Sequence, residues 1–295
     1  MLTVRQILYA PFLLLPLVVA IADENKTTKT PEARRAAIEK FLPTSDKDAH
    51  KLINLNNAYL ARELAARENI DPLLEDTEKL RAKLKETIKA QKHAYTELPI
   101  IHSGKPEVID HLSRSQLLRI SILMDDLLNG DLVKDIGKIL DSAKENEEAG
   151  GVVLLKNTKV NFKVLPNAST GTGSIRFIAN YLFPDDSFNE PHLFLFHTHP
   201  HIKGQRTDNG PSWDIQGTRY GVAIRGDIGV ASAMAKYYGE SHHLVVSTFG
   251  DPKDRMFNID YFGGEAVNAK VPENDFDVES MLDHMRVLDV GIFRY

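Results

Sequence analysis

The chain has 295 residues, of which 42% are hydrophobic and 26% are charged, and its formal net charge is -5. This composition is that of a globular protein, long enough for one large domain or two small ones. Lysine and arginine form no basic stripe, which argues against binding to nucleic acid through phosphate neutralisation. The chain has no cysteine, so disulfides, a cysteine nucleophile and thiolate metal ligands are excluded. A zinc site must therefore use histidine and carboxylate ligands.

Residues 1–22 have the pattern of a secretory signal peptide. Arg5 supplies a positive charge, residues 7–20 are almost entirely apolar, and Ala-Ile-Ala at residues 20–22 fits a cleavage site between small residues. An uncleaved signal anchor is the alternative, but the apolar run is short for a membrane span and contains two prolines. We expect a mature protein that begins at Asp23, is secreted or periplasmic, and has no membrane contact after cleavage.

Residues 23–144 are predicted to form an all-helical region. Apolar residues recur at three- and four-residue steps from Pro31 to about Lys92 and again from Ser113 to Ala143, which is the period of amphipathic helices. The segment between these two runs contains Pro and Gly and is predicted to be a connector. This region carries no chemistry that its sequence reveals.

The pattern changes at Gly150, where short β-rich runs separated by Gly, Asn, Asp and Pro begin. The predicted strands are residues 150–156, 160–165, 174–183, 192–199, 219–224, 242–249 and 256–262. A helix is predicted over residues 227–240, between the strands at 219–224 and 242–249. For residues 145–295 we therefore expect an α+β fold, in which helices flank a mixed β-sheet.

The sharpest motif is Phe-His-Thr-His-Pro, with its histidines at His197 and His199, directly after the apolar run Leu-Phe-Leu. Two histidines at i and i+2 at the end of a strand point to the same face, where both imidazoles can bind one metal ion. Two histidines and one carboxylate leave a fourth zinc position open for water, as in catalytic zinc sites. Asp214, in a turn into a new element, is the preferred third ligand; Asp208, in a polar loop, is the alternative.

The order of these residues resembles the JAMM motif of the MPN-domain metalloproteases, over about residues 145 to 265. That motif has a Glu before an apolar strand, then His-[Ser/Thr]-His, then Ser and Asp. Here Glu148 precedes Ala-Gly-Gly-Val-Val-Leu-Leu, and Glu147 is its rival by register. Two features differ from the motif: 12 residues separate His199 from Ser212, and Ser212 lies two rather than three residues before Asp214.

The resemblance implies a role for each of these residues. His197, His199 and Asp214 bind Zn²⁺, which lowers the pKa of water at the fourth position. Glu148 accepts a proton from that water and passes it to the leaving amine. Ser212 donates a hydrogen bond to the tetrahedral oxyanion. These roles describe an exported zinc peptidase or isopeptidase that acts on a peptide or protein substrate.

Two other functions remain open. One is a metal-binding or interaction module that has the fold without catalysis, since a fold does not fix a function. The other is a zinc amidase that acts on a non-protein substrate. Of the remaining polar residues near the motif, His192, His201, Arg206 and Trp213 are interpreted as packing or substrate contacts. A structural or surface role is expected for the pair His242 and His243.

Overall fold

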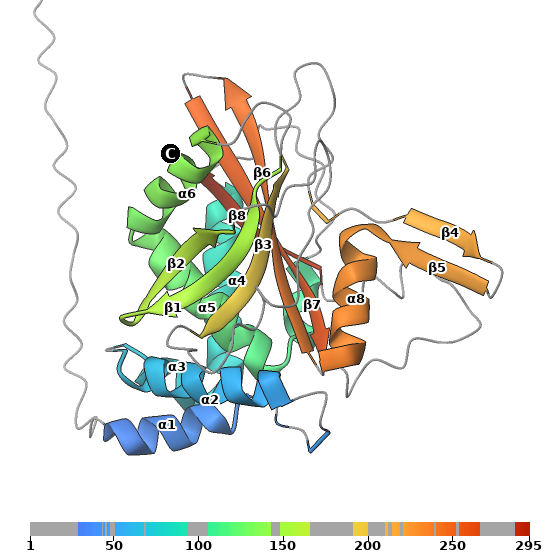
Figure 1. The fold of residues 1–295 in the computed structure, drawn as a ribbon. Helices are drawn as coiled ribbons and strands as arrows, with labels where there is room; N and C mark the ends of the chain where they lie inside the picture. The colour runs from blue at the N-terminus through green and yellow to red at the C-terminus, as the bar shows by residue number, and fades with distance from the viewer. Residues whose placement is uncertain are drawn as a thin grey trace, which may run out of the picture.

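The structure, a computed structural model, has a mixed α+β fold in which helices flank one curled, mixed sheet, as predicted (Figure 1). It describes residues 29–42, 44, 46–47, 51–67, 69–93, 106–142, 148–165, 191–199, 210–211, 214–218, 221–238, 240–251, 254–265 and 287–295. The predicted signal peptide and the predicted strand at 174–183 lie outside these ranges.

Seven helical segments precede the sheet in the described part of the chain. They are α1 (Pro31–Glu39), α2 (Lys51–Ala65), α3 (Asp71–Glu75), α4 (Thr77–His93), the 3-10 helix η2 (Pro106–His111), α5 (Arg114–Leu128) and α6 (Asp131–Ser142). The best defined start is that of α5, where Ser113 and Gln116 form a reciprocal capping box. None of the helices that the structure describes has both the length and the apolar character needed to cross a membrane.

The main sheet has six strands in the order β2-β1-β3-β6-β7-β8. They are β1 (Gly150–Lys156), β2 (Lys159–Val164), β3 (His192–His199), β6 (Glu240–Asp251), β7 (Asp254–Glu265) and β8 (Leu288–Arg294). The pair β3–β6 is parallel, and the other neighbours are antiparallel. A separate hairpin of β4 (Asp214–Thr218) and β5 (Gly221–Arg225) leads into α8 (Gly226–Tyr238). Strands β4 and β8 were not predicted from the sequence.

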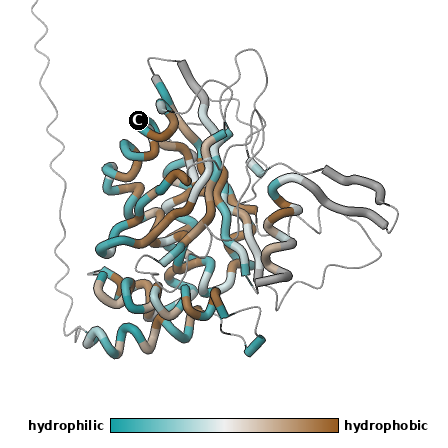
Figure 2. Tube along the Cα trace, viewed as in Figure 1, coloured by the Kyte–Doolittle hydropathy of each residue, from teal (hydrophilic) through white to brown (hydrophobic). Residues whose placement is uncertain are grey.

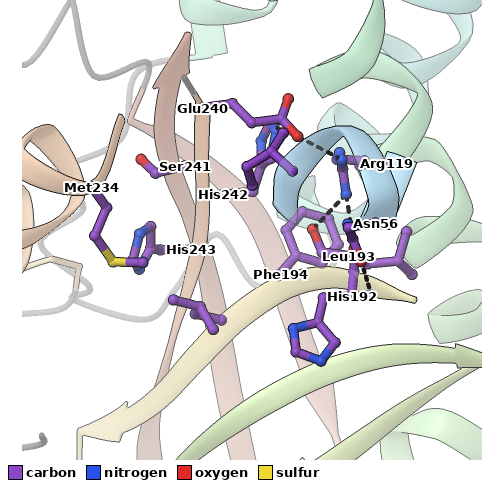
Figure 3. A pocket seen from close by; sticks show the side chains of 12 residues that line it. Asn56, Arg119, His192, Leu193, Phe194, Met234, Glu240, Ser241, His242 and His243 are labelled. Carbon is purple, nitrogen blue, oxygen red and sulfur yellow. Dashed lines mark hydrogen bonds and ion pairs between the residues drawn. The ribbon is translucent and has the colours of Figure 1, made fainter. Parts of the chain in front are cut away.

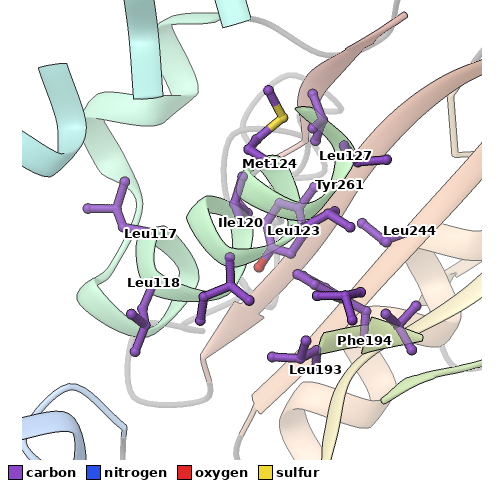
Figure 4. Packing of buried hydrophobic residues seen from close by; sticks show 14 of the residues in the cluster. Leu117, Leu118, Ile120, Leu123, Met124, Leu127, Leu193, Phe194, Leu244 and Tyr261 are labelled. Atoms are coloured by element: carbon purple, nitrogen blue, oxygen red, sulfur yellow. The ribbon is translucent and has the colours of Figure 1, made fainter. Parts of the chain in front are cut away.

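The two faces of the sheet bury different partners. On β3, Phe194 and Phe196 belong to the large core that also contains the apolar residues of α5 (Figure 4). Leu195, between them, packs in a smaller cluster on the opposite face, beside Met234 of α8. This alternation is the period of two that a strand imposes on its side chains. Figure 2 shows the brown apolar residues gathered along the strands and on the helices that pack on them. The first face of the sheet therefore shares one core with α1–α6, and the second face is the one that α8 covers.

A buried arginine, Arg119 of α5, ties the helices to the beginning of β3 (Figure 3). It is 1% exposed and donates to the carbonyl oxygens of His192 and Leu193 at 3.1 and 3.0 Å. It also donates to Asn57 and to the Glu240 carboxylate at 2.9 and 3.1 Å. Burial raises the pKa of Glu240, but the Arg119 charge and the other partners outweigh this and leave the pKa lowered.

A cavity of about 50 Å³ lies beside this arginine. Its lining comes from the beginnings of β3 and β6 and from α2, α5 and α8. Ligand pockets usually have volumes of about 300–1,000 Å³, so this cavity is too small for a substrate. It lies at the end of β3 opposite to the predicted metal ligands.

We predict that Arg119→Met lowers the free energy of unfolding by about 3–5 kcal/mol, because it leaves the Glu240 charge buried without its partner. Chemical denaturation of the purified protein measures this change. Arg62→Met is the matched control, since Arg62 is 49% exposed and lies 3.8 Å from Glu63; exposed pairs of this kind contribute about 0–1 kcal/mol. Equal changes in the two variants would contradict the importance of the buried ion pair.

Candidate metal centre

Two histidines and an aspartate bring their metal-binding atoms together at the end of β3. The Nε2 atoms of His197 and His199 are 3.2 Å apart. The carboxylate of Asp227, in the first turn of α8, faces both rings: Oδ1 lies 3.2 Å from Nε2 of His197, and Oδ2 lies 3.6 Å from Nε2 of His199. The three ligand atoms all lie within 4.8 Å of one another, so this group can hold a metal ion.

The strand positions the two histidines. Since Phe196 faces the large core, His197 and His199 must point to the opposite face, toward α8. On one side β3 pairs with β1, where Gly150 is opposite His197, and on the other it pairs with β6, where Val245 is the partner of His197. Hydrogen bonding to both neighbours fixes the backbone that carries the imidazoles.

Helix α8 supplies the aspartate from the other side. Ile228 and Ala231 of α8 pack against Val245 and Phe262 of the sheet, which presses the beginning of the helix onto the face that carries the histidines. Gly226 has φ 75°, a conformation that glycine adopts without a steric penalty, and so β5 can turn into α8 directly before Asp227. The positive end of the helix dipole also favours a carboxylate in the first turn.

The site is buried on one side and accessible on the other. The side chain of His197 is 6% exposed, whereas those of His199 and Asp227 are 18% and 20% exposed. A ligand from solvent therefore approaches past His199 and Asp227, while the body of the sheet shields His197.

Glu148 lies on the same face of the sheet, directly before β1. The register that pairs Gly150 with His197 continues outward, because the backbone N–H of Thr198 donates to the carbonyl oxygen of Ala149 at 2.8 Å. Residues two apart on a strand share a face, so Glu148 lies on the same face as His197. The continued register places it opposite His199. The glycine at 151 is required here, since a Cβ would lie 2.0 Å from the carbonyl oxygen of β2 and 2.9 Å from the Phe196 ring.

The pKa of Glu148 is shifted by these surroundings. Burial raises the pKa above its ordinary value, the His197 charge opposes that rise, and the negative charge of Asp227 adds to it. Since both charges act on it, the carboxyl group of Glu148 is an immediate neighbour of the metal-binding group. A partly desolvated carboxylate next to a metal site is a good proton acceptor at neutral pH.

The structure brings together only part of the predicted site. His197 and His199 meet as expected, with Glu148 beside them, but the carboxylate that joins them is Asp227. Asp214 begins β4, with its Cα paired to that of Arg225, two residues before Asp227. The side chain of Asp214 is outside what the structure describes, as are Glu147, His201, Arg206, Asp208, Ser212 and Trp213. The role of Asp214 therefore stays a prediction.

Asp227 was not predicted as a ligand from the sequence, although a helix was predicted to begin there. The signal was present in the sequence: an acidic residue in the first turn of the first helix after the histidine-bearing strand. The hairpin of β4 and β5 lies between the two, and the candidates considered for the third ligand were the nearer Asp208 and Asp214.

The neighbouring histidines of β6 have different surroundings. His242 faces the large core, where its Nδ1 lies 3.0 Å from the Tyr261 hydroxyl and its Nε2 lies 3.2 Å from Glu240. His243 faces α8, stacks on Phe262 with ring centroids 5.1 Å apart, and is 3% exposed. Burial, helped by the charges of His197 and His242, lowers the pKa of His243 to about 3, so this ring is neutral at physiological pH.

Comparisons of the chain with protein-family models, with curated proteins and with solved structures found no match. The interpretation of the site therefore rests on the residues and geometry of this chain.

We predict that Asp227→Asn lowers metal affinity by more than about 100-fold, because loss of a direct ligand should exceed the 10–100-fold effect of removing a group that only supports one. Elemental analysis of purified, dialysed protein measures bound metal. Asp214→Asn is the matched comparison and should retain the metal. The opposite result, with metal lost in Asp214→Asn and kept in Asp227→Asn, would restore Asp214 as the third ligand.

Proposed function

We propose that this protein is an exported zinc-dependent peptidase or isopeptidase, with His197, His199 and Asp227 as zinc ligands and Glu148 as general base. The observation that carries the proposal is the convergence of two imidazoles and two carboxylates, from β3, α8 and the segment before β1, at one partly exposed point. Export is inferred from the pattern of residues 1–22 alone.

The donor set fits zinc. Zinc in hydrolases is bound by imidazole nitrogen and carboxylate oxygen, with three protein ligands and one position left for water. Two nitrogens at about 2.0–2.1 Å from a tetrahedral ion lie roughly 3.4 Å apart, close to the 3.2 Å between the Nε2 atoms of His197 and His199. Bound there, zinc supplies Lewis acidity and makes water a stronger acid near neutral pH.

The remaining chemistry belongs to the side chains of this chain. Glu148 takes a proton from the attacking water as its oxygen bonds to the scissile carbonyl carbon. The carbon–nitrogen bond then breaks, and the same carboxyl group returns the proton to the leaving amine. Burial raises the pKa of Glu148, which makes its carboxylate a stronger base than an exposed one.

Thr198 positions the base. Its side-chain Oγ1 accepts a hydrogen bond from the backbone N–H of Ala149 at 2.9 Å, and its own N–H donates to the Ala149 carbonyl at 2.8 Å. A hydroxyl thus takes the place of a backbone acceptor where β1 begins and holds the residue next to Glu148. The residue between the two histidines therefore connects the ligands to the base.

We predict that Glu148→Gln keeps the metal and reduces turnover at least about 100-fold, because Gln has the shape of Glu but cannot accept the proton. The assay is chelator-sensitive cleavage of a defined peptide and isopeptide library, read by mass spectrometry, beside elemental analysis. Glu107→Gln, an exposed residue of η2, is the control. Cleavage by Glu148→Gln at the wild-type rate would refute its role, and a metal-loaded wild type without activity on any amide would favour the non-catalytic module.

For Thr198 we predict that substitution by Val impairs catalysis and substitution by Ser does not. Thr198→Val removes the acceptor for Ala149 N–H and should lower kcat about tenfold or more with KM and metal content little changed, since only the base is displaced. Thr198→Ser keeps the hydroxyl and should retain most of kcat. If both variants lose activity equally, packing of the threonine methyl group, and not the hydrogen bond, is what matters.

A further inference from the structure

A cleft of about 540 Å³ lies between α6 and the hairpin of β1 and β2, which are side by side in Figure 1. Ligand sites usually have volumes of about 300–1,000 Å³, so this cleft has room for a ligand. Buried apolar side chains form part of its lining, since Leu132 and Val160 are 5% and 7% exposed. The cleft is remote from the metal centre: Lys156 lies in its wall, six residues along β1 from Gly150, the partner of His197, or about 20 Å along the strand.

A set of buried contacts holds the hairpin wall of the cleft in place. Arg67, after α2, lies 2.5 Å from the Asp126 carboxylate of α5 and donates to the carbonyl oxygen of Thr158 at 2.8 Å. Asp126 in turn accepts from the backbone N–H of Val160 at 2.7 Å. These contacts flank Thr158 at φ 64°, a conformation that β-branched residues rarely adopt. Backbone strain persists where the surroundings enforce it, and it clusters at functional sites, which points to this wall of the cleft.

The α6 wall of the cleft is balanced in charge. The Nζ of Lys134 lies 3.9 Å from the Asp131 carboxylate, and the Nζ of Lys138 lies 2.7 Å from the Asp135 carboxylate. Residues at i and i+3 are neighbours on a helix surface. Each lysine of this wall is therefore matched by the aspartate one turn before it.

The hairpin wall is positive. Its described lining residues are two lysines, two asparagines and a valine, and none of these is acidic. Lys156 and Lys159 stand directly opposite one another in the strand register. Lys159 is exposed, and in the part of the chain that the structure describes it has no ion-pair partner. The unbalanced charge of the cleft therefore lies at Lys159, where it attracts an anionic group.

We propose that this cleft is an exosite, a place away from the reacting centre that binds an extended acidic segment of a polypeptide substrate, with a carboxylate at Lys159. Asn129, Asn157 and Asn161 line the cleft, and a side-chain amide both donates and accepts hydrogen bonds, as the peptide groups of such a segment require. The aspartates of the α6 wall repel a continuous polyanion such as nucleic acid, whereas a polypeptide can alternate its charges. That the ligand is a substrate rests on the proposed peptidase function, but the binding itself needs no catalysis.

The experiment is fluorescence anisotropy with two labelled decapeptides, one with three glutamates and the other with three glutamines at the same positions. The full-length Glu148→Gln protein is used, and mass spectrometry checks that the peptides stay intact. We expect the glutamate peptide to bind at least about fivefold more tightly, from exposed ion pairs that each contribute about 0.2–1 kcal/mol. Adding Lys159→Glu should abolish this preference, because it replaces attraction by repulsion, and Lys159→Arg should retain it. Lys89→Glu, at an exposed position of α4 outside the cleft, makes the same change in net charge and is the matched control.

Three results contradict the exosite. The first is equal affinity for the two peptides, and the second is an equal loss of affinity in the Lys159→Glu and Lys89→Glu proteins, which would show attraction by overall charge alone. The third is tighter, Lys159-dependent binding of a decanucleotide, which would assign the cleft to nucleic acid. The two proposals fail separately: Lys159-dependent binding by a protein that cleaves no amide contradicts the peptidase alone, and binding without charge preference by an active peptidase contradicts the exosite alone.

Discussion

The hydrogen bonding of β3 to a neighbour on each side is the constraint on which the rest of the structure depends. At its beginning, Arg119 binds two consecutive carbonyl oxygens of the strand and the buried Glu240 of β6. At its end stand His197 and His199. Because the strand is anchored through α5 and held by β1 and β6, the imidazoles have little freedom to move. Functional groups placed on rigid elements in this way keep a geometry that loops do not maintain.

Because side chains alternate along each strand, the two faces of the sheet carry different kinds of residues. The face toward α1–α6 supplies the shared core and encloses the buried Arg119–Glu240 ion pair, and the face toward α8 carries His197, His199 and Glu148, with Asp227 of α8 opposite the two histidines. In the part of the chain that the structure describes, α8 is the helix that covers this second face, through contacts at Ile228 and Ala231. The larger apolar core lies on one face, and the other face holds the partly buried histidines that face Asp227.

The sequence predicted the features that depend on local pattern. His197 and His199 were identifiable because residues at i and i+2 on a strand point to the same face. Glu148 was identifiable because it precedes a glycine-rich strand at a suitable sequence distance from the two histidines. Asp227 was missed because its approach depends on how α8 packs, with a hairpin intervening. Strand β8 was missed because Asp289 and Gly291 are poor strand formers, and only pairing with β7 makes that segment extended. The helices showed their apolar stripes, but a stripe does not reveal the surface on which it packs.

The proposed base, Glu148, and the candidate metal ligands come from three elements far apart in sequence, and short connections link them. Thr198 stands between the histidines and binds the residue next to Glu148, while Gly226 joins β5 to the helix that carries Asp227. A shift of β3 by one residue would exchange the faces of Phe196 and His197 and remove both ligands at once. It would also move Thr198 away from Ala149 and release the base. The register of β3 therefore positions both the candidate metal-binding group and the proposed base, and strand slippage would displace the two together.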